Sequence, residues 1–158
     1  MLVGIALFIA AAYGDIKSLR IPNRLALAVA LLGSFRLIVI GDLSAALYTI
    51  GASVMVFIVT FLLFSRGFLG GGDAKLLSAT VLLVGYQDLL SFIFVMSICG
   101  VLVSLAILLI HRTLPLWLGP RLAVLLPLEP GAQPAVPYGI AIASGGIVTL
   151  LFQSSLLG

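Results

Sequence analysis

The sequence predicts an all-α membrane protein, a polytopic bundle of six transmembrane helices. Of its 158 residues, 63% are hydrophobic and only 8% are charged, and the mean hydropathy is +1.36. A soluble domain carries about 25% charged residues. This composition excludes a soluble enzyme, a disordered chain and a nucleic-acid-binding protein with a basic face. No internal repeat or linker divides the chain, so we expect residues 1–158 to form a single transmembrane domain.

Six apolar segments are the predicted spans, because a hydrocarbon core of about 30 Å needs roughly 20 helical residues. They are Leu2–Ser18, Asn23–Ile40, Leu43–Ser65, Asp73–Gly85, Leu89–Ile110 and Ala135–Phe152. The first and fourth are strictly apolar for only about 13 residues, or about 20 Å of helix. No basic residue precedes the first segment, so we predict a retained helix and not a cleaved secretory signal.

The connection from His111 to Pro134 holds five of the seven prolines. Proline interrupts a helix, so its apolar part, Leu114–Leu128, is expected to lie along the membrane interface or to dip in and out. His111 itself is most simply explained as an interfacial residue.

The basic residues predict the orientation of the bundle. Six spans place seven of the eight in connections on one side, namely Lys17, Arg20, Arg24, Arg66, Lys75, Arg112 and Arg121. We predict that this side faces the cytoplasm and that both termini lie outside. The exception is Arg36, which is expected to snorkel toward the outer surface.

Three of the five acidic residues have ordinary structural explanations. Asp42 and Asp88 each precede a span, where a carboxylate accepts hydrogen bonds from free backbone N–H groups as an N-cap. Glu129 lies in the proline-rich connection and is expected to be solvated.

The other two, Asp15 and Asp73, are the candidate catalytic residues. Asp15 lies near the C-terminus of the first span, where the helix dipole disfavours an anion, although an ion pair with Lys17 or Arg20 is a structural alternative. Asp73 opens the fourth span, where an N-cap is the alternative. Counted along their helices, both lie about 18–20 Å from the outer surface, so the carboxyls can face each other.

Two carboxyls at close range form an aspartic dyad, because both cannot ionise together and they share a proton. One then takes a proton from water while the other donates to the scissile carbonyl. The helix dipoles predict that Asp73 ionises first and acts as the base, and that Asp15 keeps the proton.

Glycines precede Asp73, and Pro137-Tyr138-Gly139 begins the last span at the same predicted depth. The segment Gly70-Gly71-Gly72 permits close approach of another chain and could pair with an extended peptide, although a flexible turn also explains it. The single cysteine, Cys99, excludes an internal disulfide and a cysteine-rich zinc site. We expect no metal and no cofactor.

Three motifs resemble those of bacterial type IV prepilin leader peptidases. Asp15-Ile16-Lys17-Ser18-Leu19-Arg20-Ile21-Pro22-Asn23 resembles the first catalytic motif, and Gly70-Gly71-Gly72-Asp73-Ala74-Lys75-Leu76 resembles the second, the Gly-x-Gly-Asp motif. Pro137-Tyr138-Gly139-Ile140-Ala141 is similar to the motif of the final span. The resemblance implies an aspartic peptidase with Asp15 and Asp73 as its catalytic pair. It also implies that substrate-binding or site-shaping residues are Gly70, Gly71, Gly72, Lys75, Arg20, Pro22, Asn23, Pro137, Tyr138 and Gly139.

The same resemblance implies location in the bacterial inner membrane and prepilin or pseudopilin substrates. Their leaders are cut on the cytoplasmic side after a last residue that is typically Gly, just before the hydrophobic helix of the pilin. Long members of the family carry two Cys-x-x-Cys pairs and also methylate the new N-terminus. This sequence lacks such pairs, resembles the short form that accompanies tight-adherence pili, and is not expected to be a methyltransferase.

Two alternatives remain open at this stage. A presenilin-like Gly-x-Gly-Asp protease would cleave other substrates within lipid-embedded helices. A small transporter or pilus-assembly scaffold would use the same acids for protons or packing without any catalysis.

Overall fold

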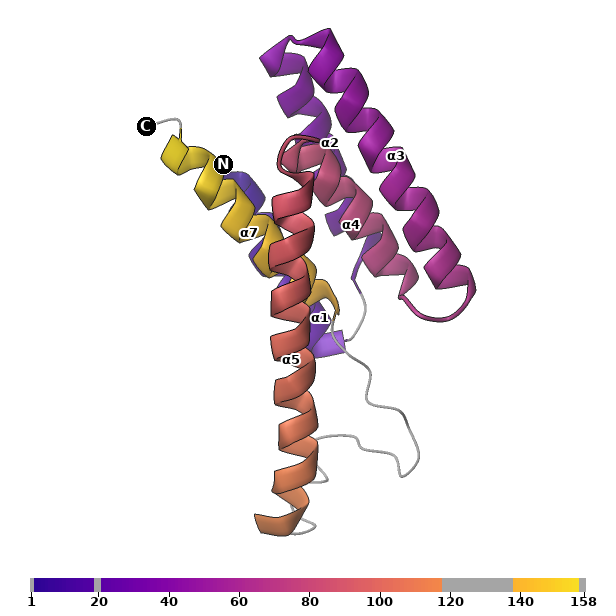
Figure 1. Cartoon of the computed structure of the whole chain (residues 1–158), viewed down its shortest axis with the longest axis vertical. Helices are drawn as coiled ribbons and strands as arrows, with labels where there is room; N and C mark the ends of the chain where they lie inside the picture. Colours follow the sequence, from indigo (N-terminus) through magenta and orange to yellow (C-terminus); the bar gives the residue numbers. More distant parts are fainter. Residues whose placement is uncertain (1, 19–20, 118–137, 157–158) are drawn as a thin grey trace.

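Six helices make up the part of the chain that the computed structural model describes, residues 2–18, 21–117 and 138–156 (Figure 1). They are α1 (Leu2–Ser18), α2 (Asn23–Ile40), α3 (Leu43–Ser65), α4 (Gly71–Val84), α5 (Leu89–Trp117) and α7 (Tyr138–Leu156). No strand occurs in these ranges. The predicted all-α class is therefore confirmed.

Four described helices contain segments long and apolar enough to cross a membrane: Asn23–Ile40, Leu43–Ser65, Leu89–Ala106 and Tyr138–Ser155. Two further predicted spans, α1 and α4, have only 17 and 14 residues and do not reach this length. The chain is thus a membrane protein with several apolar helices, and the six-span topology stays a prediction.

Most helix ends agree with the prediction to within a few residues, and two differ in ways that matter. Helix α5 continues to Trp117, beyond the predicted end at Ile110, although Pro115 removes one backbone donor from its last turns. Helix α4 begins at Gly71, so its N-cap is Gly70 and not Asp73. The rest of the connection before α7, with Arg121 and Glu129, lies outside the described residues.

Helix α4 is the centre of the bundle. It packs against α2 and α3 on one side and against α7, with a smaller contact to α5, on the other (Figure 1). More than half of its residues are buried, namely Ala74, Leu76, Leu77, Ala79, Thr80, Val81, Leu83 and Val84. Neighbouring helices therefore cover most of the side surface of α4, although α4 is too short to span a bilayer by itself.

Glycines let neighbouring helices approach closely at two of these contacts. A methyl group added at Gly33 of α2 would lie 2.8 Å from the backbone of Leu82 and Leu83 in α4. A methyl group added at Gly146 of α7 would lie 2.5 Å from the ring of Phe8 in α1, which is fully buried. These contacts fix the spacing of α2 against α4 and of α1 against α7.

The turn between α2 and α3 follows the predicted capping chemistry. Gly41 ends α2 in the left-handed region, with φ of 70°, where a glycine has no steric cost. Asp42 then caps α3, because its carboxylate accepts from the backbone N–H groups of Ser44 and Ala45. The N-cap prediction for Asp42 is confirmed.

Arg36 has partners that the sequence does not predict, while its snorkelling toward the outer surface stays a prediction. Its guanidinium donates to the carbonyl oxygens of Leu83 and Val84, at 2.6 and 2.7 Å, where α4 ends. These terminal carbonyls have no partner within their own helix and carry the negative end of its dipole, so they attract the cation. Gln153 of α7 donates to the same Val84 oxygen and to the carboxylate of Asp88.

Candidate active site

Asp15 lies on the last turns of α1, where α1 meets the N-terminus of α7. Its side chain is buried, with 3% of its surface exposed. The carboxylate accepts hydrogen bonds from the backbone of Gly139 and Ile140, whose N–H groups belong to the first turn of α7 and have no carbonyl partner within that helix. Lys17, the alternative partner considered from the sequence, has an exposed side chain.

Gly139 makes this contact possible because it has no side chain. A methyl group at Gly139 would lie 2.7 Å from Oδ2 of Asp15 and 2.9 Å from Cδ1 of Ile21. Both distances are shorter than real carbon contacts allow. The predicted site-shaping role of Gly139 therefore has a geometric basis. Without a side chain at residue 139, the backbone of α7 comes close enough to donate to the Asp15 carboxylate.

Asp73 lies in the first turn of α4 and contacts the residue that caps that helix. Its carboxylate accepts a hydrogen bond from the backbone of Gly70, the N-cap. A side chain in the first turn that reaches back to the N-cap is half of a capping box. A methyl group at Gly70 would lie 2.6 Å from Oδ2 of Asp73. Any larger residue at position 70 would therefore force the carboxylate to move.

The two carboxyls are near enough to interact electrostatically. Each also has one buried oxygen without a hydrogen-bond partner among the described residues, Oδ2 of Asp15 and Oδ1 of Asp73. An unsatisfied buried carboxyl oxygen is costly, so folded proteins keep such atoms mainly where they have a function. The arrangement leaves two acceptor atoms available for a water molecule or a substrate.

Each of the two carboxyls contacts the N-terminus of a helix. The helix dipoles therefore do not distinguish the two aspartates, although the sequence had suggested that they would. Asp15 is near the C-terminus of its own helix, but its carboxylate contacts the positive end of α7. Asp73 contacts the positive end of α4. The helix dipoles thus stabilise a negative charge at either position and do not select the base.

Ile21 connects the two halves of the site, and the sequence analysis did not single it out. Its side chain is 7% exposed. A methyl group at Gly72 of α4 would lie 3.0 Å from the Ile21 carbonyl oxygen and 3.2 Å from its Cβ, and Cδ1 of Ile21 faces Gly139 of α7. One feature of the sequence could have indicated this role of Ile21. It is a large apolar residue directly before Pro22, and a residue before proline favours an extended backbone.

The remaining predicted residues fall into three groups. Lys75 and Asn23 are brought together, since Nζ of Lys75 donates to Oδ1 of Asn23 at 3.1 Å. Gly71 packs against the ring of Phe64 in α3. Pro22 is the N-cap of α2, and Tyr138 is exposed at the start of α7.

Two of the predicted residues, Arg20 and Pro137, lie outside the described residues. Within the described ranges, no three His, Cys, Asp or Glu side chains gather as a metal site would require. The chemistry visible in these ranges is that of two carboxyls and backbone donors.

A family model identifies the chain. The model of the type IV leader peptidase family matches residues 2–105, which include α1 to α4 and both aspartates. The chain belongs to this family. No curated protein and no solved structure gives a significant match.

Membership in the leader peptidase family makes the protein a prepilin-type leader peptidase in the broad sense. The matched region ends at residue 105 and does not include α7, which supplies the backbone donors to Asp15. The contact between α1 and α7 is therefore a structural observation that the family match does not contain.

Proposed function

We propose that this leader peptidase is an aspartic endopeptidase that removes the leader of prepilins or pseudopilins, with Asp15 and Asp73 as its catalytic pair. The observation that carries the proposal is the interaction of two carboxyls, each with a buried oxygen free of hydrogen-bond partners in the described part of the chain. The same geometry would be unfavourable in a merely structural pair, because like charges at close range destabilise the fold.

The reaction proceeds by activation of water between the two carboxyls. One ionised carboxylate takes a proton from the water as its oxygen attacks the scissile carbonyl carbon, and the protonated partner donates to the carbonyl oxygen. Collapse of the tetrahedral intermediate breaks the C–N bond. The carboxyl that took the proton from water donates it to the leaving nitrogen, and the ionised partner takes back the proton of one hydroxyl as the new carboxyl group forms, so the pair returns to its starting state. The pair titrates as a unit, so either aspartate can begin the cycle as base.

The topology that fits this reaction has six spans, with both termini outside and the active site facing the cytoplasm of the bacterial inner membrane. The support is the distribution of basic residues, since Lys17, Arg24, Arg66 and Lys75 all lie near the helix ends that carry Asp15 and Asp73. A basic leader would then be bound at the cytoplasmic surface while the apolar helix of the pilin stays among the spans.

The chain acts, in this proposal, as one peptidase domain over residues 1–158 and without methyltransferase activity. The Cys-x-x-Cys pairs that accompany methylation in the long forms of the family are missing from the sequence, where residues 15–23 lead directly into α2. Mass spectrometry of the mature pilin is expected to show an unmethylated N-terminus.

The test uses a reporter prepilin with a basic leader ending in Gly, followed by an apolar helix of about 20 residues. We expect Asp15→Asn and Asp73→Asn each to lower its cleavage by at least about 100-fold, since each removes one proton-transfer group. Glu129→Gln is the matched carboxyl-to-amide control and should cleave normally. Mature pilin from both aspartate variants would contradict the aspartic mechanism, and cleavage inside the apolar helix would favour a presenilin-like activity.

A further inference from the structure

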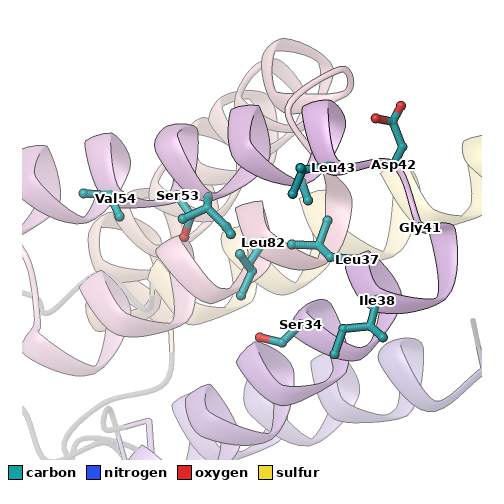
Figure 2. Close-up of a pocket in the computed structure, with 11 residues that line it drawn as sticks. Ser34, Leu37, Ile38, Gly41, Asp42, Leu43, Ser53, Val54 and Leu82 are labelled. Carbon is teal, nitrogen blue, oxygen red and sulfur yellow. The ribbon is translucent and has the colours of Figure 1, made fainter.

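Two adjoining cavities form a groove between α2 and α3 on the surface of α4. The larger, of about 630 Å³, lies near the α2–α3 turn, and the smaller, of about 430 Å³, lies near Lys75 (Figure 2 shows the larger). Ser53 and Leu82 line both, so the two cavities adjoin at these residues. We call this surface the α2–α3 groove.

The groove has the length of a membrane-spanning helix. Its lining on α2 extends from Asn23 to Gly41, and the 18 residues of α2 rise about 27 Å. The hydrocarbon core of a bilayer is about 30 Å thick. An occupant of the whole groove would therefore cross the membrane beside α2, α3 and α4.

The chemistry of the groove suits an apolar occupant. Its hydroxyl groups are already satisfied, because Ser34 donates to the carbonyl of Ala30 and Ser53 donates to that of Ser78. Ser78 in turn donates to the carbonyl of Lys75. Exposed apolar side chains lie along the edges, with Leu27 60% and Ile38 77% exposed.

The shape of the groove favours a helix over a lipid acyl chain. Ala26, Ala30 and Ser34 line it at every fourth position of α2, so they form one face of small side chains. Small residues at this spacing let a second helix approach closely and accept its side-chain ridge. An acyl chain gains nothing from a four-residue repeat.

One end of the groove opens beside the candidate active site. Lys75 and Asn23 lie at this end, and Lys75 follows Asp73 by two residues on α4, an axial rise of about 3 Å. Residues two positions apart lie on opposite faces of a helix, so the Asp73 side chain is on the other face of α4 from the groove. A chain that leaves the groove at this end reaches the Asp73 carboxyl by turning around the N-terminus of α4, where Gly70, Gly71 and Gly72 lie.

From these observations we infer that the α2–α3 groove binds the apolar helix of the prepilin, with the bond to be cleaved just beyond the end marked by Lys75 and Asn23. This inference rests on the proposed function and assigns it a substrate-binding surface. The groove positions the helix, and the leader junction extends from it toward Asp73 and Asp15.

The first test fills the groove. Ala30→Phe is expected to lower cleavage of the reporter prepilin at least tenfold, while cleavage of a leader-junction peptide without the apolar helix changes less than twofold. Leu102→Phe is the matched control, since Leu102 lies exposed on α5 and outside the groove. Normal cleavage of the reporter by Ala30→Phe, or an equal loss on both substrates, would overturn the inference.

The second test does not depend on activity or on the fold tolerating a phenylalanine. Ala30→Cys in a Cys99→Ala, Asp73→Asn background is oxidised with a reporter that carries one cysteine in the middle of its apolar helix. We expect a cross-linked adduct from Ala30→Cys and none from Leu102→Cys. An enzyme dimer linked through residue 30, or no adduct at all, as expected if only lipid fills the groove, would overturn the inference.

The two tests also separate the inference from the proposed function. If the wild-type protein fails to cut the reporter at its leader junction while the Ala30→Cys adduct forms, the groove binds the helix and the proposed peptidase function fails. If the wild-type protein cuts the reporter and no adduct forms, the function stands and the groove assignment is wrong.

Discussion

The backbone of Gly139 lies against the carboxyl of Asp15, so closely that a methyl group at residue 139 would be 2.7 Å from Oδ2. This contact joins the first helix of the chain to the last described one. It supplies Asp15 with backbone donors while its Oδ2 keeps no hydrogen-bond partner among the described residues. The geometry at Gly139 therefore decides how the carboxyl is held.

Gly139→Ala is expected to lower prepilin cleavage at least tenfold, because the added methyl group displaces either the Asp15 carboxyl or α7. Overpacking of this kind costs about 1–3 kcal/mol of stability. Gly51→Ala is the matched control, since no atom lies within 4 Å of the position its methyl group would take. Equal cleavage rates for the two variants, measured with the reporter prepilin, would show that the contact is unimportant.

Ile21→Ala is expected to destabilise the protein by about 2–4 kcal/mol, because it leaves a cavity between the first turns of α4 and α7. The measurement is reversible unfolding in detergent. Ile16→Ala removes the same atoms from a side chain that is 66% exposed on α1 and should have little effect. Ile21→Val should lose about 0.5–1.5 kcal/mol. A loss no larger than that of Ile16→Ala would contradict the packing role of Ile21.

Arg36→Leu is expected to cost about 1.5–3 kcal/mol, the usual value of a hydrogen bond from a charged group. The variant leaves the last carbonyls of α4 without the guanidinium that donates hydrogen bonds to them and balances the negative end of the helix dipole. Arg66→Leu is the control, because Arg66 is exposed at the end of α3. If thermal unfolding in detergent gives the same midpoint for both variants, Arg36 does not stabilise α4.

The cap at Asp42 makes the stability depend on pH. The hydroxyl of Ser44 and the backbone N–H of Ala45 stabilise the carboxylate and hold the pKa of Asp42 below its ordinary value of 3.8. A lowered pKa in the folded state adds stability above the unfolded value, and this stability is lost as the pH falls through the folded pKa. Asp42→Ala should therefore be less stable than the wild type at pH 7, with a difference that shrinks below pH 3.8. A pH-independent difference in unfolding midpoint would contradict the electrostatic part of the cap.

The sequence predicts the helices well because apolar runs and caps are local properties. The Gly41–Asp42 turn is an example, since both its left-handed glycine and its capping carboxylate can be recognised from neighbouring residues. Motif positions also indicated Asp15 and Asp73, which the structure places near enough to interact electrostatically.

The contacts that the sequence does not predict are between distant segments. The position of Asp15 in α1 implied an unfavourable dipole, and only the packing of α7 shows that its backbone partners belong to another helix. Arg36 was expected to snorkel because it is the one basic residue away from the predicted cytoplasmic side. The structure adds that its partners are 47 and 48 residues away in α4. Ile21 acquires its role only when Gly72 and Gly139 are placed on either side of it.

The contact between α1 and α7 has a consequence for biogenesis. Asp15 is synthesised early, and its donors, Gly139 and Ile140, follow more than a hundred residues later in the chain. Until α7 packs, the Asp15 carboxyl lacks these donors and the candidate pair is incomplete. If Asp15 and Asp73 are the catalytic pair, as we propose, the nascent chain is inactive as a protease until α7 has packed against α1.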